Sequence, residues 1–143
     1  MNIEKTERTI LHVVWSTRDW EPHLRNETVR NKLFTFLQSR DSLYGVNIEQ
    51  INGGHEHVHC LFLNTTNEDA KKIIRTMRKD ANIWLKEKGY PECKWDNDFL
   101  VLPVTDDDLN DVSLYIKDQT SYHEQYSFAH EYDLLLSSYW IAK

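Results

Sequence analysis

The stretch VNIEQINGGHEHVHCLFL, residues 46–63, decides the fold of this chain. It holds two runs rich in apolar and β-branched residues, and Gly53-Gly54 separates them, an order that predicts a β-hairpin. Residues alternate in the second run, so His57 and His59 share one face of the strand, with Cα atoms about 6.7 Å apart. Two imidazoles at that spacing can bind one metal ion, or they are simply solvated on a half-exposed sheet.

Strands are also expected near the start of the chain and after its middle. Residues 9–16 (TILHVVWS) are β-branched and aromatic, and residues 99–104 (FLVLPV) are apolar, which predicts a strand in each place. Pro103 cannot donate a ladder hydrogen bond and therefore favours an edge strand or the end of a strand.

Helices are expected between these strands and after them. Asn26 can cap a helix with Val29 and Leu33 on its apolar face, and Thr65 with Glu68 forms a capping-box pattern before a long helix. Gly89 and Pro91 end the long helix; a helix from about 106 and another over 128–136 follow. The order β-α-β-β-α-β-α predicts an α+β fold: a split βαβ antiparallel sheet of ferredoxin type, with helices on one face and a C-terminal catalytic helix.

Length and composition predict one domain over residues 1–143. The chain has no apolar run long enough to span a membrane, and its first ten residues are charged and lack the apolar core of a signal peptide. Cys60 and Cys93 form no CxxC pair, which is typical of reduced core thiols. We therefore expect a cytoplasmic protein with no membrane partner.

Charge is unevenly distributed along a chain of net charge −6. The segment 71–88 is basic, whereas the segment after residue 105 is acidic. A basic helix on an acidic body can bind nucleic acid, or it can be an ordinary solvated face.

His55-Glu56-x-x-His59 matches the zinc-protease motif as a string. That motif requires a helix, because residues i and i+4 share a face only at helical period. Period-two alternation after Gly53-Gly54 argues for a strand instead.

Tyr115 and Gln119 lie four residues apart and are expected on one face of the helix that begins near residue 106. Tyr122 continues their row, away from the apolar stripe of Leu109 and Ile116. The pair would be an ordinary surface pair, or it would add a nucleophile and a third metal ligand to the two histidines.

These residues resemble a known family. His57-Val58-His59 after Gly-Gly is similar to the HUH motif of single-tyrosine insertion-sequence transposases, the small group that includes the REP-associated proteins. Tyr115-Ile116-x-x-Gln119 resembles their catalytic helix. The opening HVVWSTR (12–18) and the FAHEY segment (128–132) resemble their first strand and their closing segment.

The resemblance implies cleavage and rejoining of single-stranded DNA without ATP. Tyr115, rather than Tyr122, would attack and form a 5′-phosphotyrosine, and His57, His59 and Gln119 would hold Mg²⁺ or Mn²⁺. Glu56, without touching the ion itself, would orient a ligand histidine or the metal's water, unless it is a solvated hairpin residue.

The partners that the resemblance implies are the single-stranded ends of a DNA element and a second copy of the chain. In such a homodimer the tyrosine can serve the partner's site. Basic residues are expected to contact the DNA backbone: Arg18, Lys71, Lys72, Arg75, Arg78 and Lys79.

Two other classes of protein stay open on the sequence. A sheet of this order is also typical of RNA-recognition domains, non-catalytic modules that stack bases on exposed aromatic side chains. A zinc-dependent hydrolase using the HEHVH segment (55–59) is the second alternative.

Overall fold

One antiparallel sheet organises the computed structural model, which describes the backbone of residues 9–142 and the side chains of residues 9–137. Its strand order is β2-β3-β1-β4. The strands are β1 (Ile10–Thr17), β2 (Asn47–Gly53), β3 (His57–Leu63) and β4 (Trp95–Val104). The hairpin of β2 and β3 and the edge position of β4 were both predicted, and this order confirms the split βαβ fold of α+β class.

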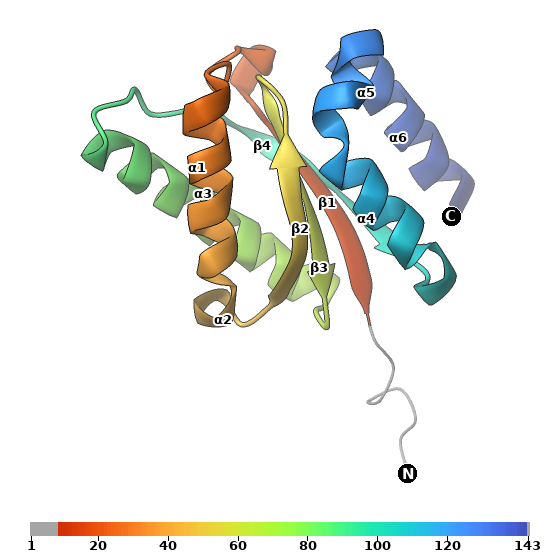
Figure 1. Ribbon diagram of the computed structural model, residues 1–143. Helices are drawn as coiled ribbons and strands as arrows, with labels where there is room; N and C mark the ends of the chain where they lie inside the picture. The colour runs from red at the N-terminus through yellow and green to blue at the C-terminus, as the bar shows by residue number, and fades with distance from the viewer. Residues whose placement is uncertain (1–8, 143) are drawn as a thin grey trace.

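Helices cover both faces of the sheet (Figure 1). α1 (Glu27–Ser39) and α3 (Asn67–Glu87) lie on one face. α4 (Leu109–Lys117) packs on the other face, and α5 (Gln119–Gln125) and α6 (Phe128–Ala142) follow it on that side. Short elements complete the order: the 3₁₀ turns η2 (Arg18–Trp20) and η3 (Asp106–Asp108), and the helix α2 (Asp41–Tyr44).

The two faces of the sheet bury different side chains. Leu11, Val13 and Trp15 of β1 alternate toward α1 and α3 and form the main apolar core with residues of β3 such as Phe62. A smaller core on the opposite face contains Ile10, Leu61, Leu63 and Ile116. Because α4 supplies Ile116, and Leu109 and Val112 pack beside it, the predicted apolar stripe of this helix does face the sheet.

Helix starts follow the capping rules, with one correction. The Asn26 side chain accepts a hydrogen bond from the Val29 amide at 3.1 Å, as predicted. The cap of α3 is Thr66, not Thr65, because the Thr66 hydroxyl accepts from the Asp69 amide at 3.1 Å. The predicted position was therefore wrong by one residue.

Two element boundaries differ from the expectation. β4 begins at Trp95, four residues before the apolar run at 99, because it pairs with the end of β1 beyond an irregularity in the ladder. The expected single helix after residue 106 is divided at Asp118 into α4 and α5. None of the helices in the described part of the chain is long and apolar enough to cross a membrane.

Candidate metal and nucleophile site

A tight turn positions the two histidines of β3. The Gly54 amide donates to the His57 carbonyl at 3.1 Å, closing the hairpin. A Cβ at Gly53 would come within 2.1 Å of that same carbonyl oxygen, so only glycine fits there. His57 and His59 lie on one face, as predicted, but both are 0% exposed. The alternative that both histidines are solvated on a half-exposed sheet is therefore excluded, because α4, α5 and α6 cover this face.

His57 is held from three sides. Its Nδ1 lies 2.8 Å from Glu56 Oε1 and its Nε2 lies 2.9 Å from Gln119 Oε1. The ring of Phe128 stacks on the imidazole, with centroids 4.0 Å apart and planes inclined by 9°. Glu56 is thus a partner of His57 rather than a solvated hairpin residue, and Gln119 is brought to the histidines.

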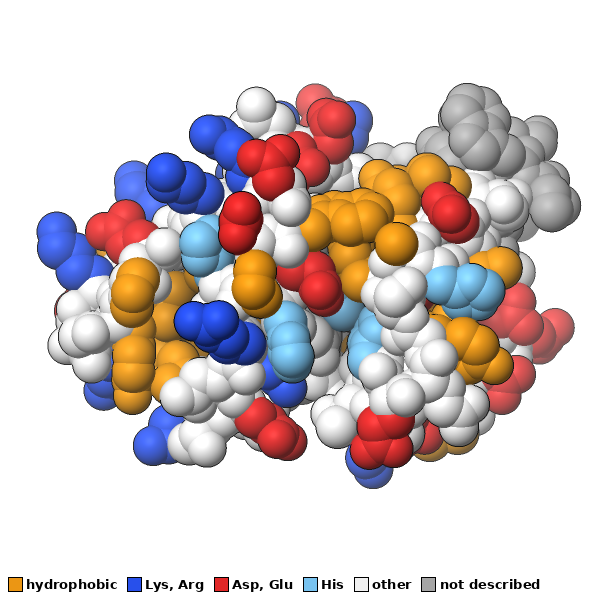
Figure 2. Space-filling model, turned by 90° about the horizontal axis from the view of Figure 1, so that it is seen from above, with side chains coloured by type: hydrophobic (Ala, Val, Ile, Leu, Met, Phe, Trp, Pro, Cys, Tyr) orange, Lys and Arg blue, Asp and Glu red, His pale blue; other side chains and the backbone are white. Residues whose placement is uncertain are grey.

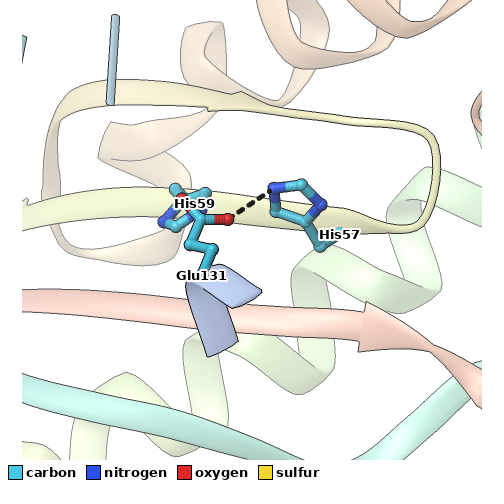
Figure 3. A group of neighbouring side chains, drawn as sticks. All are labelled: His57, His59 and Glu131. Atoms are coloured by element: carbon cyan, nitrogen blue, oxygen red, sulfur yellow. Dashed lines mark ion pairs between the residues drawn. The ribbon is translucent and has the colours of Figure 1, made fainter. Parts of the chain in front are cut away.

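Glu131 of α6 is the residue that the sequence reasoning missed. Its side chain enters the space between the two histidines (Figure 3), with His57 Nε2 and His59 Nε2 each 3.3 Å from a carboxylate oxygen. Tyr115 donates its hydroxyl hydrogen to Glu131 Oε2, and Gln119 Nε2 donates to the same oxygen at 2.9 Å. The carboxylate is therefore the common partner of every residue in the expected catalytic set.

Electrostatics of the site follow from its burial. Desolvation lowers the pKa of His59 to about 4, although the Glu131 carboxylate, 3.3 Å from His59 Nε2, opposes the shift. Burial alone would raise the pKa of Glu131, but the hydrogen bond from His123 and the close approach of His59 outweigh it and hold that pKa well below the usual range. Desolvation, and then the Glu131 charge, raise the pKa of the Tyr115 phenol. Glu131 is therefore an anion at pH 7, beside a neutral His59 and a neutral Tyr115.

Tyr115 and Tyr122 occupy different environments. Tyr115 packs against the smaller core and its ring centroid lies 5.6 Å from that of His59. Gln119 is 0% exposed, so the predicted polar row turns into the protein at the break between α4 and α5 instead of running along a surface. Tyr122 contacts the Tyr115 ring at 5.5 Å. Of the two tyrosines, Tyr115 is the one hydrogen-bonded to the carboxylate.

The donor atoms present suit a divalent cation. Ligand atoms of His57, His59 and Glu131 all lie within 4.8 Å of one another. His59 Nε2 is buried and has no hydrogen-bond partner within the described residues, although it points to this space. Two imidazoles with one carboxylate are a donor set that first-row metals accept.

Two other histidines, His55 and His123, lie close to the site. His55 is exposed in the hairpin turn, and because residues 55–59 form a turn and a strand, the zinc-protease arrangement does not occur. The Nε2 atom of His123 lies 3.0 Å from Gln119 Oε1 and 3.1 Å from Glu131 Oε1. His123 is therefore part of the site.

A cleft of about 420 Å³ opens beside the site, between the hairpin turn and the α5–α6 junction. Arg25 and Arg30 line it together with Gln119 and His123. Figure 2 shows histidine side chains in the middle of this side of the molecule, with Lys and Arg gathered toward α1 and α3. The basic residues predicted on α3 belong to the layer across the sheet from His57 and His59. These residues are Lys71, Lys72, Arg75, Arg78 and Lys79.

The sheet does not offer the stacking surface of an RNA-recognition domain. Every residue of β1 and β3, the two central strands, is buried beneath helices. Base stacking on an open sheet, which that alternative requires, is therefore excluded for these strands.

Known proteins provide an independent comparison. Residues 5–119 match the family model described as "Transposase IS200 like". None of the curated proteins is similar enough to count as a match. Among solved structures, a candidate transposase from Deinococcus radiodurans R1 is 20% identical, with a TM-score of 0.51 over 83% of this chain and 96% of that one. A REP-associated tyrosine transposase bound to a REP hairpin is 12% identical, with a TM-score of 0.51 over 80% and 68%.

Identities this low support a shared fold and nothing finer. The family model, in contrast, spans most of the sequence, including the hairpin with its two histidines and the Tyr115–Gln119 segment. This chain belongs to the family of IS200-like transposases.

Proposed function

We propose that the protein cleaves and rejoins single-stranded DNA through a 5′-phosphotyrosine formed on Tyr115, with Mg²⁺ or Mn²⁺ as cofactor. The observation that carries the proposal is the meeting of Tyr115, His57, His59 and Gln119 at one buried carboxylate, Glu131. A nucleophile and a set of metal donors in one site are the parts that phosphoryl transfer needs.

Tyr115 would attack the scissile phosphorus, and the bond to the 3′ oxygen would break, releasing a 3′ hydroxyl. The phosphotyrosine keeps the energy of the phosphodiester, so rejoining needs no ATP. Glu131 Oε2 accepts the Tyr115 hydrogen bond and is the group positioned to take the phenolic proton. Because the pKa of Tyr115 is raised and that of Glu131 is lowered, the resting site keeps the proton on the tyrosine.

His57, His59 and Gln119 would hold the divalent ion, with Glu131 as an additional ligand. When bound, the ion would polarise the scissile phosphate and favour ionisation of the nearby phenol. Glu56 would orient His57 by accepting a hydrogen bond from its Nδ1–H group, since Nδ1 lies 2.8 Å from Glu56 Oε1.

The DNA strand would reach the site through the neighbouring cleft. Arg25 is exposed at its edge, whereas Arg30 is 5% exposed and donates to the Leu24 carbonyl at 2.7 Å, so Arg30 shapes the cleft wall. Arg18 and the basic residues of α3 would bind more distant parts of the DNA backbone. Binding that depends on these phosphates should weaken steeply as salt rises.

A homodimer is also proposed, on the family resemblance. Within one chain Tyr115 already contacts the carboxylate beside His57 and His59, so the arrangement favours attack in cis. Light scattering on the protein with and without DNA tests assembly; a mass near 17.1 kDa in both samples contradicts the dimer. One domain over residues 1–143 and a cytoplasmic location stay predictions.

The decisive experiment looks for the covalent adduct. The protein is incubated with Mn²⁺ and a pool of single-stranded oligonucleotides that carry hairpins with randomised flanks, labelled at either the 3′ or the 5′ end. A 5′-phosphotyrosine transfers only the 3′ label to the protein band on a denaturing gel. Tyr115→Phe should abolish the band, Tyr122→Phe should keep it, and EDTA should remove it.

The other outcomes separate the alternatives. Metal binding without an adduct supports the zinc-dependent hydrolase, and DNA binding with neither metal nor adduct supports a non-catalytic module. Loss of the adduct in Tyr122→Phe but not in Tyr115→Phe would transfer the nucleophile's role to Tyr122.

A further inference from the structure

His12 of β1 is a buried histidine that the proposed chemistry does not use. Its side chain is 4% exposed, and its Nε2 lies 2.7 Å from His59 Nδ1. The two rings stack with centroids 5.0 Å apart and planes inclined by 21°. β1 and β3 pair with Val14 opposite His59 and His12 opposite Leu61, so His12 lies diagonally next to His59 on the same face. The burial of two polar imidazoles on neighbouring, mostly apolar strands requires a physical explanation.

The two nitrogens of His59 have different surroundings. Nδ1 lies within hydrogen-bond distance of His12, whereas Nε2 lies 3.3 Å from Glu131 Oε2, is buried, and makes no hydrogen bond to a described residue. A histidine binds a metal through a nitrogen lone pair, and its other nitrogen then carries the proton and needs an acceptor. The atom in place to be that acceptor for His59 is His12 Nε2.

We propose that His12 is a positioning residue for the metal site. Its Nε2 accepts a hydrogen bond from the Nδ1–H group of His59 and so directs the Nε2 lone pair of His59 toward the ion. The inference rests on the proposed metal site. Both rings are neutral and share two protons, one on each Nδ1 in the metal-competent arrangement. In the alternative arrangement both protons are on Nε2, and His59 donates toward Glu131. The change between them is a tautomeric shift in each ring, with no proton gained or lost.

The two proposed histidine ligands thus donate their Nδ1 hydrogen bonds to different kinds of acceptor. His57 has the carboxylate of Glu56, whose side chain is 24% exposed and remains partly solvated. His12 lies deep beneath the helices, where a carboxylate would bury a second negative charge close to Glu131. A neutral imidazole accepts the same hydrogen without that cost. The depth at which each acceptor is buried therefore explains why one is a carboxylate and the other a neutral imidazole.

Variants of His12 test the hydrogen bond by metal affinity. His12→Phe keeps a ring of similar size but removes the acceptor, and His12→Gln restores an acceptor oxygen at the distance of Nε2. Loss of such a partner usually weakens metal binding by about 10–100-fold. Mn²⁺ titrated into the apo protein, followed by calorimetry, should show that loss in His12→Phe and most of the affinity recovered in His12→Gln. His23→Phe, which removes an exposed histidine, is the matched control and should bind like wild type.

Tautomers provide the second readout, because a merely structural role would not set them. Long-range ¹H–¹⁵N NMR of the Zn²⁺-loaded protein should show His59 and His12 both protonated on Nδ1. A proton on His12 Nε2 in that sample would overturn the inference, as would unchanged Mn²⁺ affinity in a folded His12→Phe. Failure of the wild type to bind any divalent ion would instead refute the proposed metal site. Thermal unfolding confirms that each variant is folded; if His12→Phe is not, the Gln variant and the NMR decide.

Discussion

Replacing Gly54 by alanine should disable the metal site without dismantling the hairpin. An added Cβ would lie 2.7 Å from Cε1 and 3.2 Å from Nδ1 of His57. The imidazole cannot retreat freely, because Phe128 stacks on it at a centroid distance of 4.0 Å and its two nitrogens are bonded to Glu56 and Gln119. The methyl group therefore displaces a proposed metal ligand that is packed from the other side.

The size of the displacement follows from the contact distances. Ordinary contact begins at 3.4 Å, so the ring or the turn must move by 3.4 − 2.7 = 0.7 Å. Metal sites tolerate ligand shifts of only about 0.2 Å. We expect Mn²⁺ affinity to fall at least tenfold, about 1.4 kcal/mol, and the free energy of unfolding to fall by about 1–3 kcal/mol from overpacking.

Gly45→Ala is the matched control. Gly45 has φ +74° and no atom within 4 Å of an added Cβ, so alanine there strains the backbone without touching the site. It should cost about 1–2 kcal/mol of stability and leave Mn²⁺ affinity unchanged. Urea unfolding followed by tryptophan fluorescence, with calorimetric Mn²⁺ titration, measures both quantities. Equal Mn²⁺ affinity in Gly54→Ala and wild type would refute the reasoning about His57.

Three further outcomes are expected. Tyr115→Phe should lower the free energy of unfolding in urea by about 1.5 kcal/mol, the low end for a hydrogen bond to a charged group, because Glu131 keeps its other donors. Tyr122→Phe should change it by less than about 0.5 kcal/mol. Equal losses in the two variants would contradict the Tyr115–Glu131 hydrogen bond. Glu131→Gln should weaken Mn²⁺ binding at least tenfold by calorimetry, whereas tighter binding would mean that the carboxylate competes with the ion rather than binding it. Because the pKa of His59 is lowered to about 4, its neutral form stabilises the fold above the unfolded pKa of about 6.5, and that stability is lost as pH falls from about 6.5 toward 4. His59 should therefore make the protein about 2 kcal/mol less stable to urea at pH 5 than at pH 7, and His12, whose pKa burial also lowers, adds to that loss. A His55→Asn control should retain the loss. Equal stability at the two pH values would contradict a buried, neutral His59.

Local pattern was sufficient for the order of strands and helices, though not for every boundary, and for part of the site. Alternation in HVHCLFL (57–63) determined which side chains share a face, because strand period is fixed by backbone geometry whatever the fold. The Gly53-Gly54 pair between two apolar runs predicted the hairpin. The apolar helical stripe that ends at Ile116 predicted which side of α4 meets the sheet. Each of these inferences concerns residues within one element or one turn.

Tertiary packing decided what surrounds those residues. Glu131 lies twelve residues beyond Gln119, and although it belongs to the FAHEY segment (128–132), no periodicity connects it to the histidines. It reaches them only because α6 folds back over them. His12 meets His59 through the register of β1 against β3, which no periodicity within either strand specifies. The break at Asp118, which turns Gln119 inward, was equally hidden behind regular four-residue spacing. Periodicity determines directions within an element, whereas distances between elements depend on strand register and helix docking, and these are set by the packing of the whole chain.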